Sequence, residues 1–234
     1  MRNIRVVIHE PPWTKYFFQK SFLWKYLWKK VPEISFFTQR EYLLFQKKMN
    51  IKLNKNQVFI ENVCKDFKVF SNSNIVESRL ELDISEDKTI FLCIGFVNHL
   101  KGFDKVAELF KKNEYLNSEL YIVGSVRLEN DTTSINYYDK LKSSCNNISN
   151  VTILDTYLSY KDFDLWMIAS DYIIFPYREI SNSGILGRAH ILNKRSIVRN
   201  VGGLKNQLNR NDQLYESENQ LEIIINKINS KKRT

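Results

Sequence analysis

The feature that most constrains the fold is a regular alternation of short apolar runs and longer amphipathic segments between residues 84 and 228. The predicted strands are 89–94, 120–123, 151–154 and 172–175, and the predicted helices between them are 102–112, 136–145 and 160–169. Strands that alternate with helices of this length indicate βαβ units and a parallel sheet. We therefore predict an α/β fold of the nucleotide-binding type, although such a fold alone does not define a ligand or a reaction.

The segment 176–204 ends this series and contains the first candidate site. An apolar run stops at Pro176, a polar loop follows, and a helix is predicted at 185–192 before a short strand and the pair Gly202-Gly203. Such a loop lies at the carboxyl end of a parallel strand, where the free N–H groups of the next helix face the crevice. The hydroxyls of Ser181 and Ser183 could bind a phosphate or a sugar there. The alternative is an ordinary loop whose Ser or Asn caps the helix.

The N-terminal third predicts a smaller α/β region. The predicted strands are 3–8, 34–38 and 57–60, the predicted helices are 13–31 and 41–49, and 61–76 is polar and irregular, as in a linker. We expect the chain to divide into a partial N-terminal region at 1–82 and a larger domain at 83–234. The last apolar-periodic segment, 214–228, predicts a terminal packed helix.

The helix predicted at 13–31 is dense in aromatic residues and lysine, which leaves two interpretations open. A helix with Trp on one face and Lys on the other can lie in a membrane interface, or it can pack on a core with its lysines in water. Phe18 and Phe22 fall on the lysine side, which favours packing. The expected packed face comprises Trp13, Tyr16, Phe17, Trp24, Leu27, Trp28 and Val31.

Composition excludes several classes of protein. The net charge of +9 suits an anionic partner such as a nucleotide, a membrane surface or a nucleic acid, but no nucleic-acid-binding motif is present, so we expect no nucleic-acid partner. Three cysteines without short spacing and three histidines predict no metal site. Neither GxxxxGK[ST] nor GxGxxG occurs. No apolar run spans a bilayer and no signal-peptide core begins the chain, so we expect a cytoplasmic protein, with peripheral contact at the inner membrane face as an alternative.

Several motifs occur in a specific order across residues 84 to 210. They are Ile94-Gly95-Phe96-Val97-Asn98-His99-Leu100-Lys101-Gly102-Phe103-Asp104, Leu120-Tyr121-Ile122-Val123-Gly124, Ala169-Ser170-Asp171-Tyr172-Ile173-Ile174-Phe175-Pro176-Tyr177, Ser183-Gly184-Ile185-Leu186 and Gly202-Gly203-Leu204. In this order they resemble the C-terminal donor-binding half of retaining glycosyltransferases of the GT-B fold, family 4. The resemblance implies a Rossmann-like parallel sheet with helices on both faces, preceded here by an incomplete N-terminal α/β region.

The resemblance also implies a site for a nucleotide-sugar donor. Lys101 would contact the donor diphosphate, where an ammonium offsets the charge that grows on the leaving group, and no metal or cofactor is implied. Tyr157 and Leu158 would lie against the nucleobase. The remaining implied donor-binding positions are Gly95, Asn98, Gly102, Ser181, Asn182, Ser183 and Gly184.

Three positions depart from the family pattern. An arginine usually precedes the lysine of the first loop, but Phe96 and Asn98 stand at the candidate positions. A glutamate that binds the donor ribose is replaced by Arg188, and the nearby Glu179 is one place away from the usual spacing. A guanidinium binds phosphate well, so Arg188 could contact the donor phosphate instead.

Two functional hypotheses follow from the resemblance. In the first, the chain is a retaining enzyme that transfers a hexose from a nucleoside-diphosphate sugar to a glycan or lipid-linked acceptor, and His9, at a strand end, approaches the donor sugar. In the second, the chain is a non-catalytic or half-enzyme subunit that needs a partner chain to complete its acceptor domain. The shortness of the N-terminal region and the charge reversal at Arg188 favour the second.

Overall fold

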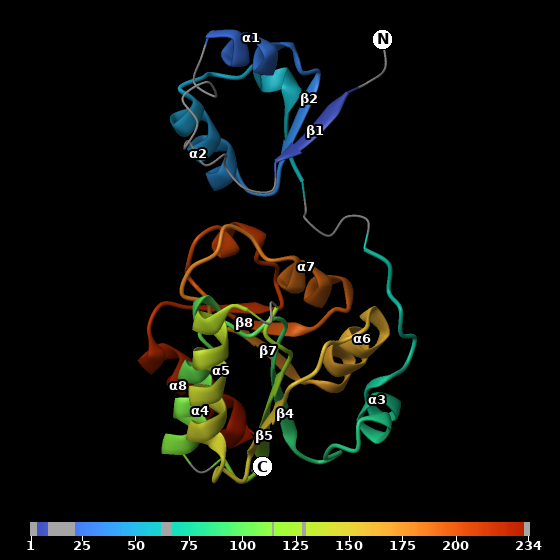
Figure 1. Cartoon of the computed structure of the whole chain (residues 1–234). Coiled ribbons are helices and arrows are strands. Elements are labelled where there is room, and N and C mark those ends of the chain that lie inside the picture. The colour runs from blue at the N-terminus through green and yellow to red at the C-terminus, as the bar shows by residue number, and fades with distance from the viewer. Residues whose placement is uncertain (1–3, 9–21, 62–66, 114, 128–129, 232–234) are drawn as a thin grey trace.

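The computed structural model describes residues 4–8, 22–61, 67–113, 115–127 and 130–231. These residues form two separate parallel sheets, one of three strands and one of six. Each sheet has its own buried cluster of hydrophobic side chains. We call the parts of the chain around them the N-terminal unit and the C-terminal unit, and Figure 1 shows them as two bodies joined by an extended connection.

The N-terminal unit has the strand order β1-β2-β3, with β1 (Arg5–Ile8), β2 (Glu33–Phe36) and β3 (Val58–Ile60) all parallel. Helix α2 (Gln39–Met49) covers it, with Phe45 and Met49 packed against Ile34 and Phe36. Helix α2 begins at a capping box: Thr38 accepts from the amide of Glu41, and the Glu41 carboxylate accepts from the amide of Thr38.

The C-terminal unit has the strand order β6-β5-β4-β7-β8-β9, again all parallel. The strands are β4 (Thr89–Ile94), β5 (Ser118–Val123), β6 (Val151–Leu154), β7 (Tyr172–Phe175), β8 (Arg195–Arg199) and β9 (Asp212–Tyr215). All six residues of β4 are buried. That pattern is typical of a central parallel strand covered on both faces.

Helices cover both faces of this sheet, as predicted. Figure 1 shows α4 and α5 on one side of β4 and β5, and α6 on the other. In α4 the spacing of Phe103, Val106 and Phe110 buries one side of the helix. The helices are α4 (Phe103–Lys112), α5 (Thr132–Cys145), α6 (Tyr160–Ala169), α7 (Gly184–Ile191) and α8 (Glu218–Lys231).

Arg79 fastens the connection between the units to the C-terminal unit. It belongs to α3 (Ile75–Glu81), which follows the irregular residues 67–74. Its guanidinium donates to the carbonyl of Ala169 at 3.0 Å, to the carbonyl of Glu86 at 2.7 Å and to the carboxylate of Asp171 at 2.8 Å. Since these acceptors flank β4 and β7, α3 is held at the start of the C-terminal unit.

One predicted helix was wrong. Residues 214–228 do not form one helix, because Leu214 and Tyr215 extend the sheet as the end of β9 and α8 begins only at Glu218. The packed face predicted for the first helix is present in part: Trp13, Tyr16 and Phe17 lie outside the described residues, and the described helix α1 (Phe22–Lys30) has no fully buried residue. Of that face Trp28 and Val31 pack on the core, whereas Trp24 and Leu27 are exposed. Within the described residues, no helix is long and apolar enough to cross a membrane.

Candidate functional site

A cleft of about 750 Å³ lies where α2 of the N-terminal unit faces the loops after β4, β5, β7 and β8. Because the carboxyl ends of parallel strands meet at one edge of a sheet, these loops converge on the crevice where α/β proteins bind ligands. We call this space the central cleft. Its lining includes Arg40, Glu41, Leu44, Lys48, Asn98, Lys101, Arg127, Glu179, Ser181, Asn182 and Gly202.

Lys101 occupies the loop after β4 and lines the central cleft, as its predicted role requires. It ends a short 3-10 turn (His99–Lys101), and Gly102 follows with φ 65°. A Cβ at Gly102 would lie 2.2 Å from the carbonyl oxygen of Pro176, so only glycine fits this turn. The Lys101 ammonium lies 3.9 Å from the centre of the Tyr177 ring, a cation–π contact that leaves its N–H groups available to an anion.

Arg178, which sequence analysis did not single out, holds the Lys101 loop in place. Its backbone amide donates to the carbonyl of Leu100 at 2.8 Å, and its guanidinium donates to the carbonyl of His99 at 2.7 Å. The same guanidinium forms a bidentate ion pair with the Asp104 carboxylate, with Nη1 2.8 Å from Oδ1 and Nη2 2.6 Å from Oδ2. Partial burial raises the pKa of Asp104, but hydrogen bonds from Arg178 and Tyr137 outweigh it, so the net pKa is lowered.

Arg127 brings a second cation to the wall of the cleft that is formed by the C-terminal unit. It follows β5, and its guanidinium carbon lies 5.6 Å from the centre of the Phe96 ring. Phe96 stands at one of the positions where an arginine was expected from the family pattern. The structure therefore places an arginine from another loop over the aromatic ring that replaces it.

The ring of Phe96 lines a second, largely apolar space of about 470 Å³, which we call the aromatic cavity. Tyr157 and Leu158 line it as well, and the Tyr157 ring centre lies 6.3 Å from that of Phe96. Gly95 contributes its backbone to the wall. The aromatic cavity thus contains the two residues predicted to lie against a nucleobase, and Arg127 lies where it adjoins the central cleft.

The Ser-Gly loop uses many of its polar groups within the protein. Ser183 is the N-cap of α7: its hydroxyl accepts from the amide of Leu186 at 3.2 Å, and its own amide donates to the side chain of Gln207 at 2.8 Å. Ser181 and Asn182 line the central cleft, and the Asn182 side chain donates to the carboxylate of Glu41. Asn182 thereby joins the loop after β7 to the cap of α2.

Arg188 is directed into the interior of the C-terminal unit. Its Nε lies 2.5 Å from Oδ1 of Asp164, its Nη2 donates to the carbonyl of Lys68 at 3.2 Å, and the two side chains are 8% and 0% exposed. The other oxygen of Asp164 accepts from the amide of Phe70 at 2.7 Å. Arg188 lines a third cavity of about 560 Å³, which also includes Gly184 and lies outside the central cleft.

The predicted site residues therefore fall into three neighbouring spaces. Asn98, Lys101, Glu179, Ser181 and Asn182 line the central cleft, whereas Gly95, Tyr157 and Leu158 line the aromatic cavity. Gly184 and Arg188 line the third cavity, Gly102 supports the Lys101 turn and Ser183 caps α7. His9 lies outside the described residues. The basic cleft residues that sequence analysis missed are Arg40, Lys48 and Arg127.

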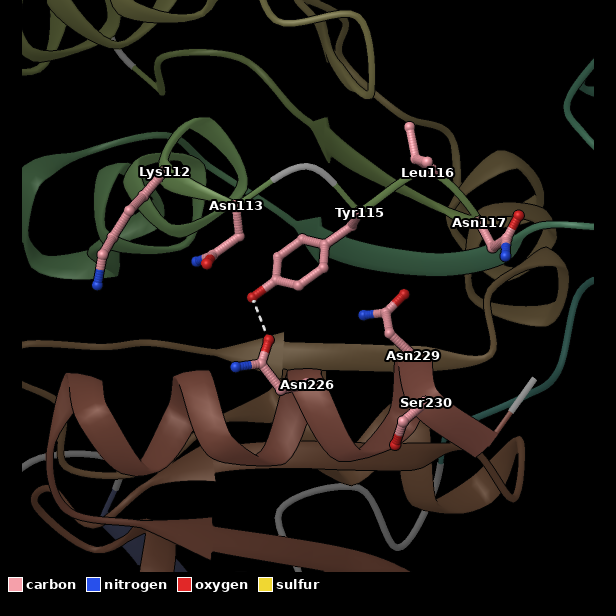
Figure 2. Close-up of a pocket in the computed structure, with 8 residues that line it drawn as sticks. All are labelled: Lys112, Asn113, Tyr115, Leu116, Asn117, Asn226, Asn229 and Ser230. Atoms are coloured by element: carbon pink, nitrogen blue, oxygen red, sulfur yellow. Dashed lines mark hydrogen bonds between the residues drawn. The ribbon is translucent and has the colours of Figure 1, made fainter. Parts of the chain in front are cut away.

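A further pocket, of about 380 Å³, lies at the other end of the sheet and has a different character. Figure 2 shows that Tyr115, before β5, reaches Asn226 on α8, and the two side chains hydrogen-bond at 2.9 Å. Ser118 also bonds to Asn229. These contacts fasten α8 to the amino ends of the strands, away from the loops that carry Lys101. Among the described residues, no group of three or more His, Cys, Asp or Glu side chains could hold a metal ion.

No protein-family model matches the sequence, and no curated protein matches it either. Solved structures do match. A sucrose-phosphate synthase from Thermosynechococcus elongatus superposes with a TM-score of 0.71 at 16% identity, over 90% of this chain and 52% of its own. Anabaena HepE in complex with UDP-glucose gives 0.71 at 15% identity, over 99% and 64%. WaaG, a glycosyltransferase involved in lipopolysaccharide biosynthesis, gives 0.67 at 15% identity, over 97% and 65%.

These matches confirm the predicted GT-B-type fold. The chain spans between 52% and 65% of the length of these three structures while nearly all of it is covered. At this level of identity the likeness establishes the fold and leaves the reaction to be argued from the site.

Proposed function

We propose that this chain is the donor-binding part of a glycosyltransferase that moves a hexose, with retention, from a nucleoside-diphosphate sugar to a glycan or lipid-linked acceptor. One observation carries the proposal: Lys101 and Arg127 line the same wall of the central cleft, beside an aromatic cavity. Their charges would stabilise the diphosphate as the bond to the sugar breaks. HepE, which has this fold, is solved with UDP-glucose bound.

The arrangement suggests an orientation for the donor. A nucleobase would lie in the aromatic cavity against Tyr157 and Leu158, and the diphosphate would cross Phe96 to reach Arg127 and Lys101. The sugar would then occupy the central cleft, facing α2. Residues 83–234 would form the donor domain in this scheme, and His9 stays a predicted contact of the donor sugar.

The experiment that tests the proposal is calorimetric titration with UDP, GDP and their glucose conjugates, followed by measurement of nucleotide release. Lys101→Ala should weaken nucleotide binding and lower any turnover by roughly a hundredfold to a thousandfold. The matched control is Lys105→Ala, because Lys105 lies one turn further along and pairs with Glu108 at 3.0 Å. The proposal fails if no nucleotide binds, or if both variants behave alike.

A second candidate, a half-enzyme subunit that needs a partner chain, has its own observation. Within the described residues, the N-terminal unit has three strands with β1 at the edge of the sheet, and the matched structures are longer than this chain. A complete acceptor domain would place further structure beside β1. Nucleotide binding without turnover, in the experiment above, would favour this candidate over the self-sufficient enzyme.

A further inference from the structure

The wall of the central cleft that faces the donor loops is formed by α2 and carries positive charge. Arg40, Leu44 and Lys48 are spaced by four residues, which places them along one side of the helix, and all three line the cleft. Lys47, in the same turn as Lys48, is exposed and does not line it. The spacing of Arg40 and Lys48 along α2 therefore places both cations at the cleft.

Arg40 reaches the floor of the cleft beside a glycine turn. Gly202 has φ +60°, and a Cβ at this position would lie 1.6 Å from the carbonyl oxygen of Ile180, so only glycine fits this turn. The same Cβ would lie 3.2 Å from Nη1 of Arg40, so the guanidinium lies beside the turn. The Arg40 side chain is exposed.

The positive charges along the cleft are divided between its two walls. The charged side chains that line it are the cations Arg40, Lys48, Lys101 and Arg127 and the carboxylates Glu41 and Glu179. The Glu41 carboxylate is buried and accepts from the amides of Phe37 and Thr38, at 3.0 Å each, and from Asn182. These hydrogen bonds fix the Glu41 carboxylate at the first turn of α2, and Arg40 and Lys48 line the same wall of the cleft.

We infer that the acceptor carries an anionic group, a phosphate or a carboxylate, and that Arg40 binds it with help from Lys48. This inference rests on the proposed function and specifies its acceptor. A guanidinium donates two parallel hydrogen bonds to either anion, and an ammonium adds charge without fixing orientation. With Lys101 and Arg127 on one wall and Arg40 and Lys48 on the other, donor and acceptor anions are held apart across the cleft.

The inference is tested on the full chain saturated with UDP, by saturation-transfer NMR with glucose 1-phosphate, glucuronate and glucose. We expect at least one of the two anions to bind more tightly than glucose. Arg40→Gln should weaken the binding of that anion by roughly tenfold to a hundredfold, which corresponds to the free energy of a hydrogen bond to a charged group. The same variant should leave the affinity for UDP unchanged. Lys48→Gln should have a smaller effect in the same direction, and Lys47→Gln, the matched control, should have none.

The outcomes separate the alternatives. Preference for glucose 1-phosphate identifies a phosphorylated acceptor, and preference for glucuronate identifies an acidic sugar. Equal binding of glucose and both anions overturns the inference. It is also overturned if Arg40→Gln lowers the affinity for UDP and leaves the affinity for the anion unchanged. If the unsubstituted chain does not bind UDP, the proposed function fails, but the dependence of anion binding on Arg40 is still measured in the nucleotide-free protein.

Discussion

The two sheets are both parallel, but they differ in how completely other elements cover them. In the C-terminal unit every residue of β4 is buried, and helices lie on both faces. In the N-terminal unit β1 alternates between exposed and half-buried residues, and β3 is mostly exposed. Parallel sheets are stable when both faces are covered. Among the described residues, the C-terminal sheet is therefore more completely covered than the N-terminal sheet.

The strongest test of this difference removes one fully buried aromatic ring from each unit. Phe91→Ala in β4 should lower the free energy of unfolding of the C-terminal unit by about 3–5 kcal/mol and shift its transition to a lower denaturant concentration. Phe45→Ala in α2 should instead unfold the N-terminal unit, whose buried cluster is much smaller. Fluorescence separates the two transitions, because Trp28 lies against the N-terminal core and Trp166 is buried in the C-terminal one.

Replacing one tryptophan at a time by phenylalanine assigns each signal. If both core variants shift a single transition by the same amount, the two units fold as one and the contrast between them is lost. Cavity-forming substitutions alter the stability of the unit that contains them, so separate transitions would sharpen the comparison.

The second test concerns the ion pair that ties the connection to the C-terminal unit. Arg188→Ala should lower the free energy of unfolding by about 3 kcal/mol, because Asp164 remains fully buried with only the Phe70 amide as donor. The control is Arg195→Ala, an exposed arginine beside Tyr172, which should change stability by about 0.5 kcal/mol or less. Urea denaturation followed by circular dichroism measures both. Equal effects would show that the buried pair does not secure the connection.

The smallest expected effect is a pH dependence carried by Lys194 in the C-terminal unit. Burial lowers its pKa from 10.5 to about 8, and its ammonium donates to the carbonyl of Ile168 at 2.9 Å. Between pH 8 and 10.5 the unfolded chain binds more protons at this residue than the folded chain does. Below pH 8 the folded protein carries the buried charge, which destabilises it fully, and this destabilisation decreases as the pH rises and Lys194 loses its proton. We expect the free energy of unfolding to increase by about 1–2 kcal/mol from pH 7 to 10.

Lys194→Met isolates this contribution. The variant should be more stable than the unsubstituted chain at pH 7, and the difference should shrink toward pH 10. Urea titrations at the two pH values give the result. A difference that does not change with pH would assign the effect of the substitution to packing rather than to ionisation.

The order and type of most helices and strands were predictable from the sequence, and the exceptions have identifiable causes. The predicted strand 172–175 and helix 160–169 coincide with β7 and α6, because each is bounded by a clear change of polarity. Strand β9 was missed because Asp212–Tyr215 contains two polar residues. It lies at the edge of the sheet and pairs with one strand, so its sequence shows little of the continuous apolar pattern of a central strand. The exposure of Trp24 and Leu27 on α1 was missed because helical periodicity groups them on one face with Trp28, which does pack on the core.

The site was predictable where its residues lie in loops that follow a readable strand end or match a family motif. Ser181 was named from the polar loop after a predicted strand, whereas Lys101 was named through the resemblance to a family. Arg40 and Arg127 were not named, because Arg40 lies on a helix of the other unit and Arg127 lies outside the motifs that carry the resemblance. The partner of Arg188 was equally hidden, since Asp164 lies on α6 and only the packing of α6 against α7 joins them.

The hydrogen bond between Asn182 and Glu41 has a consequence for the passage of substrates. It links the two sides of the cleft through the carboxylate that also closes the first turn of α2. A hydrogen bond to a charged group contributes about 1.5–3 kcal/mol, a few times the thermal energy. A link of this strength breaks and re-forms readily, and the helix cap keeps the carboxylate oriented while it is open. If the proposed function holds, a donor would enter and a nucleotide would leave through brief separations at this point, without unfolding of either wall.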